Sequence, residues 1–176
     1  AVIGNLLIYL FLGNFFGARG VGVFAICESI CIGSAIFSRY GMDNALMRYV
    51  GQEDSITRSA IKYISFALKR CAQISIVLTI FLFFLRKQIS AWYDYNTLSD
   101  VLIVALIAIP PFSLLFIISG FLKGLKKPAL AACFTNGIIA LISAVILGIF
   151  YILGLRNIIY AGWSLAISTW ALFIIG

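Results

Sequence analysis

The chain has 176 residues and a formal net charge of +7, with 63% of its residues hydrophobic and 11% charged. Its mean hydropathy of +1.11 lies far above the range of soluble domains and excludes a water-soluble core. The composition indicates an integral membrane protein, and it disfavours a nucleic-acid-binding surface because the charges are dispersed among apolar segments.

Six apolar segments approach the length of a membrane span, which is about 20 helical residues for a hydrocarbon layer of about 30 Å. Short loops connect them, and they lie at residues 1–16, 21–45, 71–89, 101–122, 129–153 and 158–175. Continuous apolar runs that contain glycine and serine, without strand-like alternation, favour helices over a transmembrane barrel. We predict an all-α polytopic bundle of six transmembrane helices that forms a single domain over residues 1–176.

The first segment begins at Ala1 without an initiator methionine, and the sequence stops at Gly176 without a polar tail. We expect it to be part of a longer chain. A cleaved signal peptide is the alternative interpretation of residues 1–16, but a charged leader and an evident cleavage site are missing. Gly20 and Gly22 loosely resemble a dinucleotide-binding turn, yet a membrane span follows them, so we predict a tight interhelical turn there.

The second segment contains three ionisable residues, Glu28, Arg39 and Asp43. A charge at bilayer depth costs about 2.5–3.5 kcal/mol on insertion scales unless it meets water or a partner. At about 100° per residue, Glu28 and Arg39 point within about 20° of each other, and Asp43 lies about 40° further round. The same stripe contains Cys31 and Ala35. We predict that it faces the interior of the bundle or a wet cavity.

Arg39 and Asp43 are one helical turn apart and can form an ion pair, whereas Glu28 lies about 16 Å from Arg39 along a helix and cannot reach it. Two interpretations stay open for each group. Glu28 either has a transport role or makes a structural hydrogen bond to a neighbouring helix. Arg39 and Asp43 either line a cavity or extend toward the cytoplasmic interface.

Later segments carry signals of helix bending and helix contact. Pro110 and Pro111 remove two backbone donors, so we expect a bend near the middle of residues 101–122. Glycines at four-residue spacing predict close helix packing, at Gly13 with Gly17 and at Gly120 with Gly124. Other polar side chains either join helices or line a polar space; they are Gln73, Thr79, Thr135, Asn136, Ser143, Ser164, Ser168 and Thr169.

Enzymatic and metal chemistry have little support in the sequence. The chain has no histidine, which rules out a Ser/His/Asp triad, and no pair of carboxylates has a plausible catalytic spacing. The cysteines lie in or beside apolar segments without a CxxC pattern; they are Cys27, Cys31, Cys71 and Cys133. We therefore expect neither an enzyme nor a metal or other cofactor site.

Lysine and arginine predict the orientation, because positive charge resists translocation. The loops after the second and fourth segments hold eight, which are Arg48, Arg58, Lys62, Lys69, Arg70, Lys123, Lys126 and Lys127. The opposite side holds four, Arg19, Arg86, Lys87 and Arg156, beside the interfacial aromatic residues Trp92, Tyr93 and Tyr95. We predict that the first side is cytoplasmic, together with the amino-terminal end of the first span.

Three motifs occur in the order found in polysaccharide flippases. Residues 16–24 (FGARGVGVF) look like the family's turn between its first two helices. Residues 40–49 (YGMDNALMRY) look like the glycine-rich end of helix two that leads to its arginine, and residues 119–129 (SGFLKGLKKPA) like the basic loop between helices four and five. The chain thus resembles the polysaccharide (O-antigen type) flippases of the multidrug/oligosaccharidyl-lipid/polysaccharide exporter superfamily.

The resemblance implies the amino-terminal half of a V-shaped transporter with twelve or fourteen helices in the cytoplasmic (inner) membrane. Such a protein moves isoprenoid-diphosphate-linked oligosaccharide by alternating access, with membrane lipids and polysaccharide assembly proteins as partners. Arg39 is then the expected cavity cation, while Arg48 either helps to capture the diphosphate or anchors the cytoplasmic end. Glu28 is a candidate for coupling to H⁺ or Na⁺, and removal of the lipid on the far side is the alternative source of energy.

Two other functions remain open at the level of the sequence. A cation-coupled drug or small-molecule antiporter of the same superfamily would also use a carboxylate such as Glu28. A non-transporting membrane scaffold subunit would hold Glu28, Arg39 and Asp43 fully paired and dry.

Overall fold

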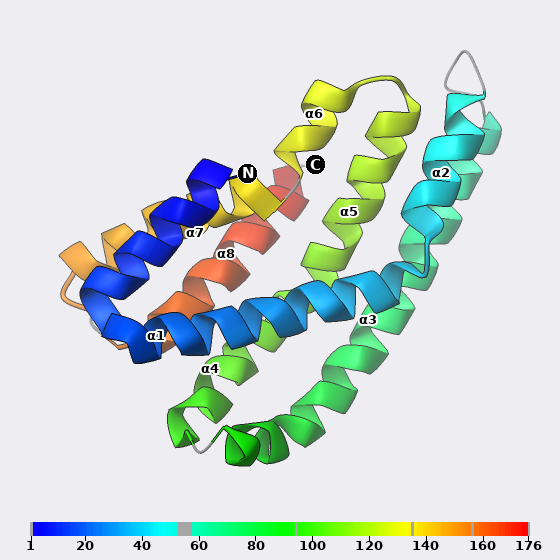
Figure 1. Cartoon of the computed structure of the whole chain (residues 1–176). Helices are drawn as coiled ribbons and strands as arrows, with labels where there is room; N and C mark the ends of the chain where they lie inside the picture. Colours follow the sequence, from blue (N-terminus) through cyan, green and yellow to red (C-terminus); the bar gives the residue numbers. More distant parts are fainter. Residues whose placement is uncertain (1, 53–57, 94, 135, 156, 176) are drawn as a thin grey trace.

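The structure, a computed structural model, describes residues 2–52, 58–93, 95–134, 136–155 and 157–175, and in this part the chain folds into helices joined by short turns. The helices are α1 (Val2–Arg39), α2 (Met42–Gly51), α3 (Arg58–Trp92), α4 (Asn96–Ile107), α5 (Ile109–Gly124), α6 (Pro128–Cys133), α7 (Asn136–Ile152) and α8 (Ile159–Ile175). The predicted all-α class is confirmed for these residues (Figure 1).

Three of the described helical segments are long and apolar enough to cross a bilayer: Ile3–Arg39, Ala60–Trp92 and Pro128–Ile152. The pair Thr97–Ile107 and Ile109–Gly124 is bent by 41° and counts as a fourth if it is one span. Ile159–Ile175 is apolar but shorter. By length and composition the described residues therefore hold three or four candidate spans, as in a multi-pass membrane protein, where the sequence predicts six.

The first two predicted spans are joined in α1, which is broken at Gly17. This residue has φ 65° and ψ −171°, a conformation that glycine adopts without the steric penalty of a Cβ atom. The two parts of α1 run in different directions from the break (Figure 1). Gly20 and Gly22 lie inside the helical part that follows, so the turn predicted at those glycines is wrong in its position.

The expected packing pair of Gly13 and Gly17 makes no close helix contact among the described residues. A Cβ atom at Gly13 would meet only the Val21 side chain there, at 3.9 Å, and one at Gly17 would meet no described atom within 4 Å. Gly17 therefore serves the change of direction rather than a close helix contact.

The predicted continuous helix over residues 21–45 is wrong at its end. Helix α1 stops at Arg39, Tyr40 and Gly41 have φ 46° and 75°, and α2 starts at Met42. A glycine in the left-handed region is a common helix terminator. The break separates Arg39 from Asp43, which a helical wheel places on one uninterrupted helix.

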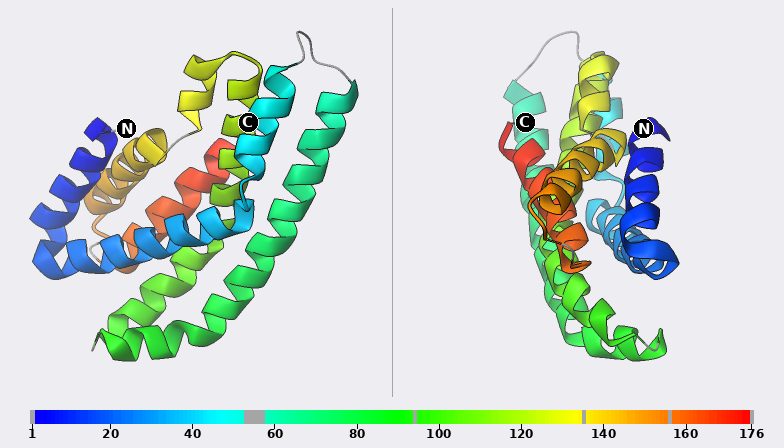
Figure 2. Two further views of the ribbon diagram at one scale, coloured as in Figure 1. Left: turned by 45° about the vertical axis from the view of Figure 1, so that its right-hand side comes forward. Right: turned by 90° about the vertical axis from the view of Figure 1, so that its left-hand side faces the viewer.

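Helix α3 extends well beyond the predicted span 71–89. It runs from Arg58 to Trp92, and at about 1.5 Å per residue it is about 50 Å long. Hydropathy marks only the part that matches the bilayer, whereas a helix can continue into water through polar residues such as Lys62 and Lys69. Only 11% of its most apolar window is buried, and α3 lies along one edge of the bundle (Figure 2), so its apolar side chains suit lipid.

The described residues form three clusters of buried apolar side chains. The first joins α1, α4, α7 and α8, and includes Leu12, Leu98, Leu102, Leu147 and Leu165. The second joins α2, α3 and α5, and includes Leu46, Val50, Ala67, Cys71 and Ile117. The third joins α1, α5, α7 and α8, and includes Ala35, Phe112, Leu115, Ile139 and Leu172. Arg39 and Asp43 lie at the junction between α1 and α2.

The bend between α4 and α5 lies at Ala108, two residues before the first of the adjacent prolines Pro110 and Pro111. In a regular helix the Ile107 carbonyl would accept a hydrogen bond from residue 111, but proline has no N–H. The indole N–H of Trp170 in α8 donates to that carbonyl instead, at 3.2 Å. From the other side, the Cys31 thiol of α1 donates to the Ala105 carbonyl at 3.4 Å. Side chains of two neighbouring helices thus hold the bend.

We expect Trp170→Phe in the full-length protein to lower the free energy of unfolding by about 0.5–1.5 kcal/mol more than Trp163→Phe does, because it leaves the Ile107 carbonyl without a donor. Trp163 is a matched control: both indoles are 41% exposed and both line a pocket with Ile107. Unfolding by SDS titration measures the difference. Equal effects of the two substitutions would show that the indole hydrogen bond does not stabilise the bend.

Candidate functional site

The candidate site is centred on Arg39, the last residue of α1. Its Nη1 donates to Asp43 Oδ2 at 2.9 Å, and its Nε donates to the Ala35 carbonyl at 3.0 Å. The predicted ion pair is therefore present, and it bridges the break at Tyr40 and Gly41 rather than one turn of a continuous helix. The two hydrogen bonds fix the plane of the guanidinium group.

Helix α5 forms the floor of the site. The Arg39 guanidinium carbon lies 4.2 Å from the centre of the Phe116 ring, close enough for an attractive cation–π interaction. The side chains of Arg39 and Asp43 are 15% and 22% exposed. The pair is thus largely covered by protein, but it retains an accessible edge.

Gly120 of α5 allows α2 to pack closely against α5. A Cβ atom at this position would lie 2.8 Å from the Asp43 backbone oxygen and 3.0 Å from its Cα atom. Gly124 makes the next contact along α5, where a Cβ atom would lie 3.0 Å from the Val50 Cβ. This pair fulfils the packing role predicted for it, and it places the Asp43 backbone directly on α5.

Glu28 has a partner that sequence reasoning missed. The Tyr9 hydroxyl donates to Glu28 Oε2 at 2.6 Å, and the Tyr9 ring meets the Phe24 ring edge to face, 6.0 Å between centroids. Tyr9 lies before the Gly17 break and Glu28 lies after it. The break folds the two parts of α1 onto each other and provides the hydrogen bond from a neighbouring helix, which was one of the two interpretations of Glu28.

The interior stripe is only partly polar. Cys31 and Ala35 are buried, with 1% and 0% of their surface exposed, and they separate Glu28 from Arg39. The structure therefore brings Arg39 and Asp43 together and leaves Glu28 in a different contact.

Arg48 lies outside this cluster. It occupies the last turn of α2 with an exposed side chain, and within the described residues no ion pair involves it. This position suits the interpretation of Arg48 as a charge at the membrane edge.

Buried hydroxyl groups join α7 to α8. Ser143 and Ser168 share a hydrogen bond of 2.6 Å, and Ser143 also donates to the Ser164 carbonyl at 3.3 Å. Thr169 donates to carbonyls of its own helix. All four residues are fully buried. Ser143, Ser164 and Ser168 therefore join the two helices, Thr169 bonds within α8, and none of the four lines a polar space among the described residues. Thr135 and the side chain of Asn136 lie outside the described part of the chain.

No family model, characterised protein or solved structure matches the chain. Its functional interpretation therefore depends on the three sequence motifs and on the geometry around Arg39.

Proposed function

We propose that the chain is the amino-terminal part of a membrane transporter that flips isoprenoid-diphosphate-linked oligosaccharide across the cytoplasmic membrane by alternating access. The observation that carries the proposal is Arg39, a largely covered cation at a helix break, which has one carboxylate partner among the described residues and an accessible edge. The order of the three flippase-like motifs gives the substrate class.

The chemistry of a diphosphate suits this cation. Arginine binds phosphate oxygens through charge-assisted hydrogen bonds that its planar fork can make in pairs. The hydrogen bonds described for Arg39 engage Nε and Nη1, which leaves Nη2 for a substrate oxygen. Asp43 balances the charge in the absence of substrate, which lowers the cost of keeping an arginine inside the membrane.

A six-span topology also forms part of the proposal. The two parts of α1 would make two crossings, and α3, the α4–α5 pair, the α6–α7 segment and α8 would make four more. The end of α2, the beginning of α3, the end of α5 and the beginning of α6 lie together at the upper end of Figure 1, opposite the end of α3 and the beginning of α4. The upper end carries most of the eight positive charges, which supports a cytoplasmic location.

The hydrogen bond between Tyr9 and Glu28 supports a second step of the proposal, coupling to H⁺ or Na⁺. Glu28 is half-buried at the contact between the two parts of α1. Binding of a cation to the carboxylate would compete with the Tyr9 hydroxyl and alter that contact. Polysaccharide assembly proteins remain proposed partners of the complete transporter.

A scaffold function is the second candidate, because every ionisable group of the stripe has a partner. Glu28 is bound by Tyr9, and Arg39 is bound by Asp43. A purely structural subunit needs those contacts and no accessible cation.

Transport by the full-length protein tests the proposal, with Arg39→Ala and Glu28→Gln compared with wild type at matched membrane expression. We expect lipid-linked oligosaccharide to accumulate on the cytoplasmic side in the Arg39 variant. Lys62→Ala is the control, since it removes an exposed charge from the same predicted side. Normal flipping by folded Arg39→Ala would overturn the assignment of Arg39, and loss of both folded proteins would favour the scaffold function.

A further inference from the structure

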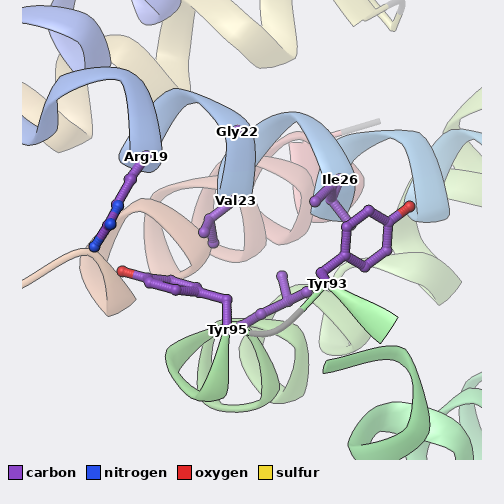
Figure 3. Close-up of a pocket in the computed structure, with 7 residues that line it drawn as sticks. Arg19, Gly22, Val23, Ile26, Tyr93 and Tyr95 are labelled. Carbon is purple, nitrogen blue, oxygen red and sulfur yellow. The ribbon is translucent and has the colours of Figure 1, made fainter. Parts of the chain in front are cut away.

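A groove separate from Arg39 lies between α1 and the turn from α3 to α4. One pocket of about 420 Å³ is lined by Arg19, Val23, Ile26, Tyr93 and Tyr95, among others (Figure 3). A second pocket, of about 460 Å³, shares Ile26 and Tyr93 with the first. The two pockets are therefore adjacent along α1, and together they are called the groove below.

One end of the groove is polar and positive. The Arg19 side chain is exposed and points toward the hydroxyl end of Tyr95 (Figure 3), and within the described residues no carboxylate pairs with it. Two helices also begin here: the second part of α1, directly after Gly17, and α4, directly after Tyr95. Helix N-termini carry partial positive charge and unpaired N–H groups. This end suits an anion.

The other end of the groove is apolar. It is formed by side chains of α1 and of the end of α3, which are Ile26, Ile30, Ile89 and Trp92. Trp92 is 82% exposed, as is common for tryptophan at a membrane interface. The groove therefore passes from a cationic end to a hydrocarbon-like end, which is the polarity of a lipid with an anionic headgroup.

Two hydrogen bonds join Tyr95 to the end of α3. The Ser90 hydroxyl donates to the Tyr95 carbonyl at 2.8 Å, and the Tyr95 N–H donates to the Ser90 carbonyl at 3.3 Å. Ser90 itself is buried. The Tyr95 backbone, directly before α4, is thus held by the end of α3, which reduces the entropy lost on binding.

We propose that this groove binds an anionic phospholipid of the surrounding bilayer. Arg19 and the Tyr95 hydroxyl hold the phosphodiester, and the first methylene groups of an acyl chain lie along Ile26, Ile30 and Trp92. The site does not depend on the flippase assignment, because the α1 residues that contact the lipid lie on the face of the helix opposite Arg39. It would fix the α3–α4 turn to the lipid leaflet opposite the predicted cytoplasmic side.

Native mass spectrometry of the full-length protein tests the proposal with phosphatidylglycerol as probe and phosphatidylcholine as reference lipid. We expect Arg19→Gln to weaken retention of phosphatidylglycerol about fivefold, since one basic side chain near anionic lipid contributes about that factor. Arg86→Gln is the matched control: it lies on the same predicted side, but its guanidinium stacks 4.2 Å from the Phe83 ring. Tyr95→Phe should weaken retention to a smaller extent.

Three outcomes would overturn the proposal. Unchanged retention in folded Arg19→Gln would remove the site. An equal loss in Arg86→Gln would show diffuse attraction to anionic lipid rather than a groove. Displacement of phosphatidylglycerol by an equimolar isoprenyl phosphate would assign the groove to the carrier lipid.

Discussion

Gly120→Ala will destabilise the protein by about 1–3 kcal/mol, although alanine is the better helix former by about 1 kcal/mol. The added Cβ atom would lie 2.8 Å from the Asp43 backbone oxygen, and a backbone atom cannot move aside without its helix. Helix α2 must therefore shift from α5 as a unit. The shift would also displace the Asp43 carboxylate from Arg39, so the variant should lose transport as well as stability.

Gly148→Ala is the control, and we expect it to stabilise the protein rather than destabilise it. Gly148 lies inside α7, and a Cβ atom there would meet no described atom within 4 Å. We expect this variant to gain about 0.5–1 kcal/mol from helix propensity alone. SDS-titration unfolding of the full-length variants measures both changes. A stabilising Gly120→Ala would contradict the close contact between α2 and α5.

Helix class and membrane character could be predicted because both depend on local composition. Long apolar runs can satisfy their backbone groups in a bilayer only as helices or as closed barrels, and the runs in this chain carry no strand-like alternation. The ends of the helices were harder to predict. Hydropathy reports the bilayer boundary, so it could not show that α3 begins at Arg58 and continues to Trp92.

The breaks in the first two predicted helices depend on single residues. Several glycines lie close together before and after residue 17, and each permits a positive φ, so the local sequence alone does not determine that Gly17 carries the break. The left-handed pair Tyr40 and Gly41 was missed because a helical wheel assumes an unbroken helix.

Of the two polar contacts at the candidate site, the sequence predicted the pair of Arg39 and Asp43 but not the contact of Tyr9 with Glu28. Arg39 and Asp43 are only four residues apart, so the two side chains stay within reach of each other even across the break at Tyr40 and Gly41. Tyr9 and Glu28 are separated by 19 positions, and their contact exists only because α1 folds back at Gly17. No periodicity within either segment contains that information.

Arg39→Ala and Asp43→Ala should each destabilise the full-length protein by about 2–3 kcal/mol, because each leaves an unpaired group in a largely covered site. This figure is below that of a fully buried pair, since the two side chains are 15% and 22% exposed. The double variant leaves neither charge without a partner. We expect it to be about 1–2 kcal/mol more stable than the sum of the single effects predicts. Unfolding of the wild type, the two single variants and the double variant by SDS titration completes this double-mutant cycle.

Arg48→Ala is the reference for this cycle, because Arg48 is exposed on α2 and surface changes of this kind are usually within about 0.5 kcal/mol. Transport then separates the two roles of the ion pair. If Arg39 binds the diphosphate, the double variant will fold better than the single effects predict and will still not flip its substrate. If removal of Asp43 restores flipping to an Arg39 variant, the arginine acts only through its ion pair, and the substrate must be held by a different cation.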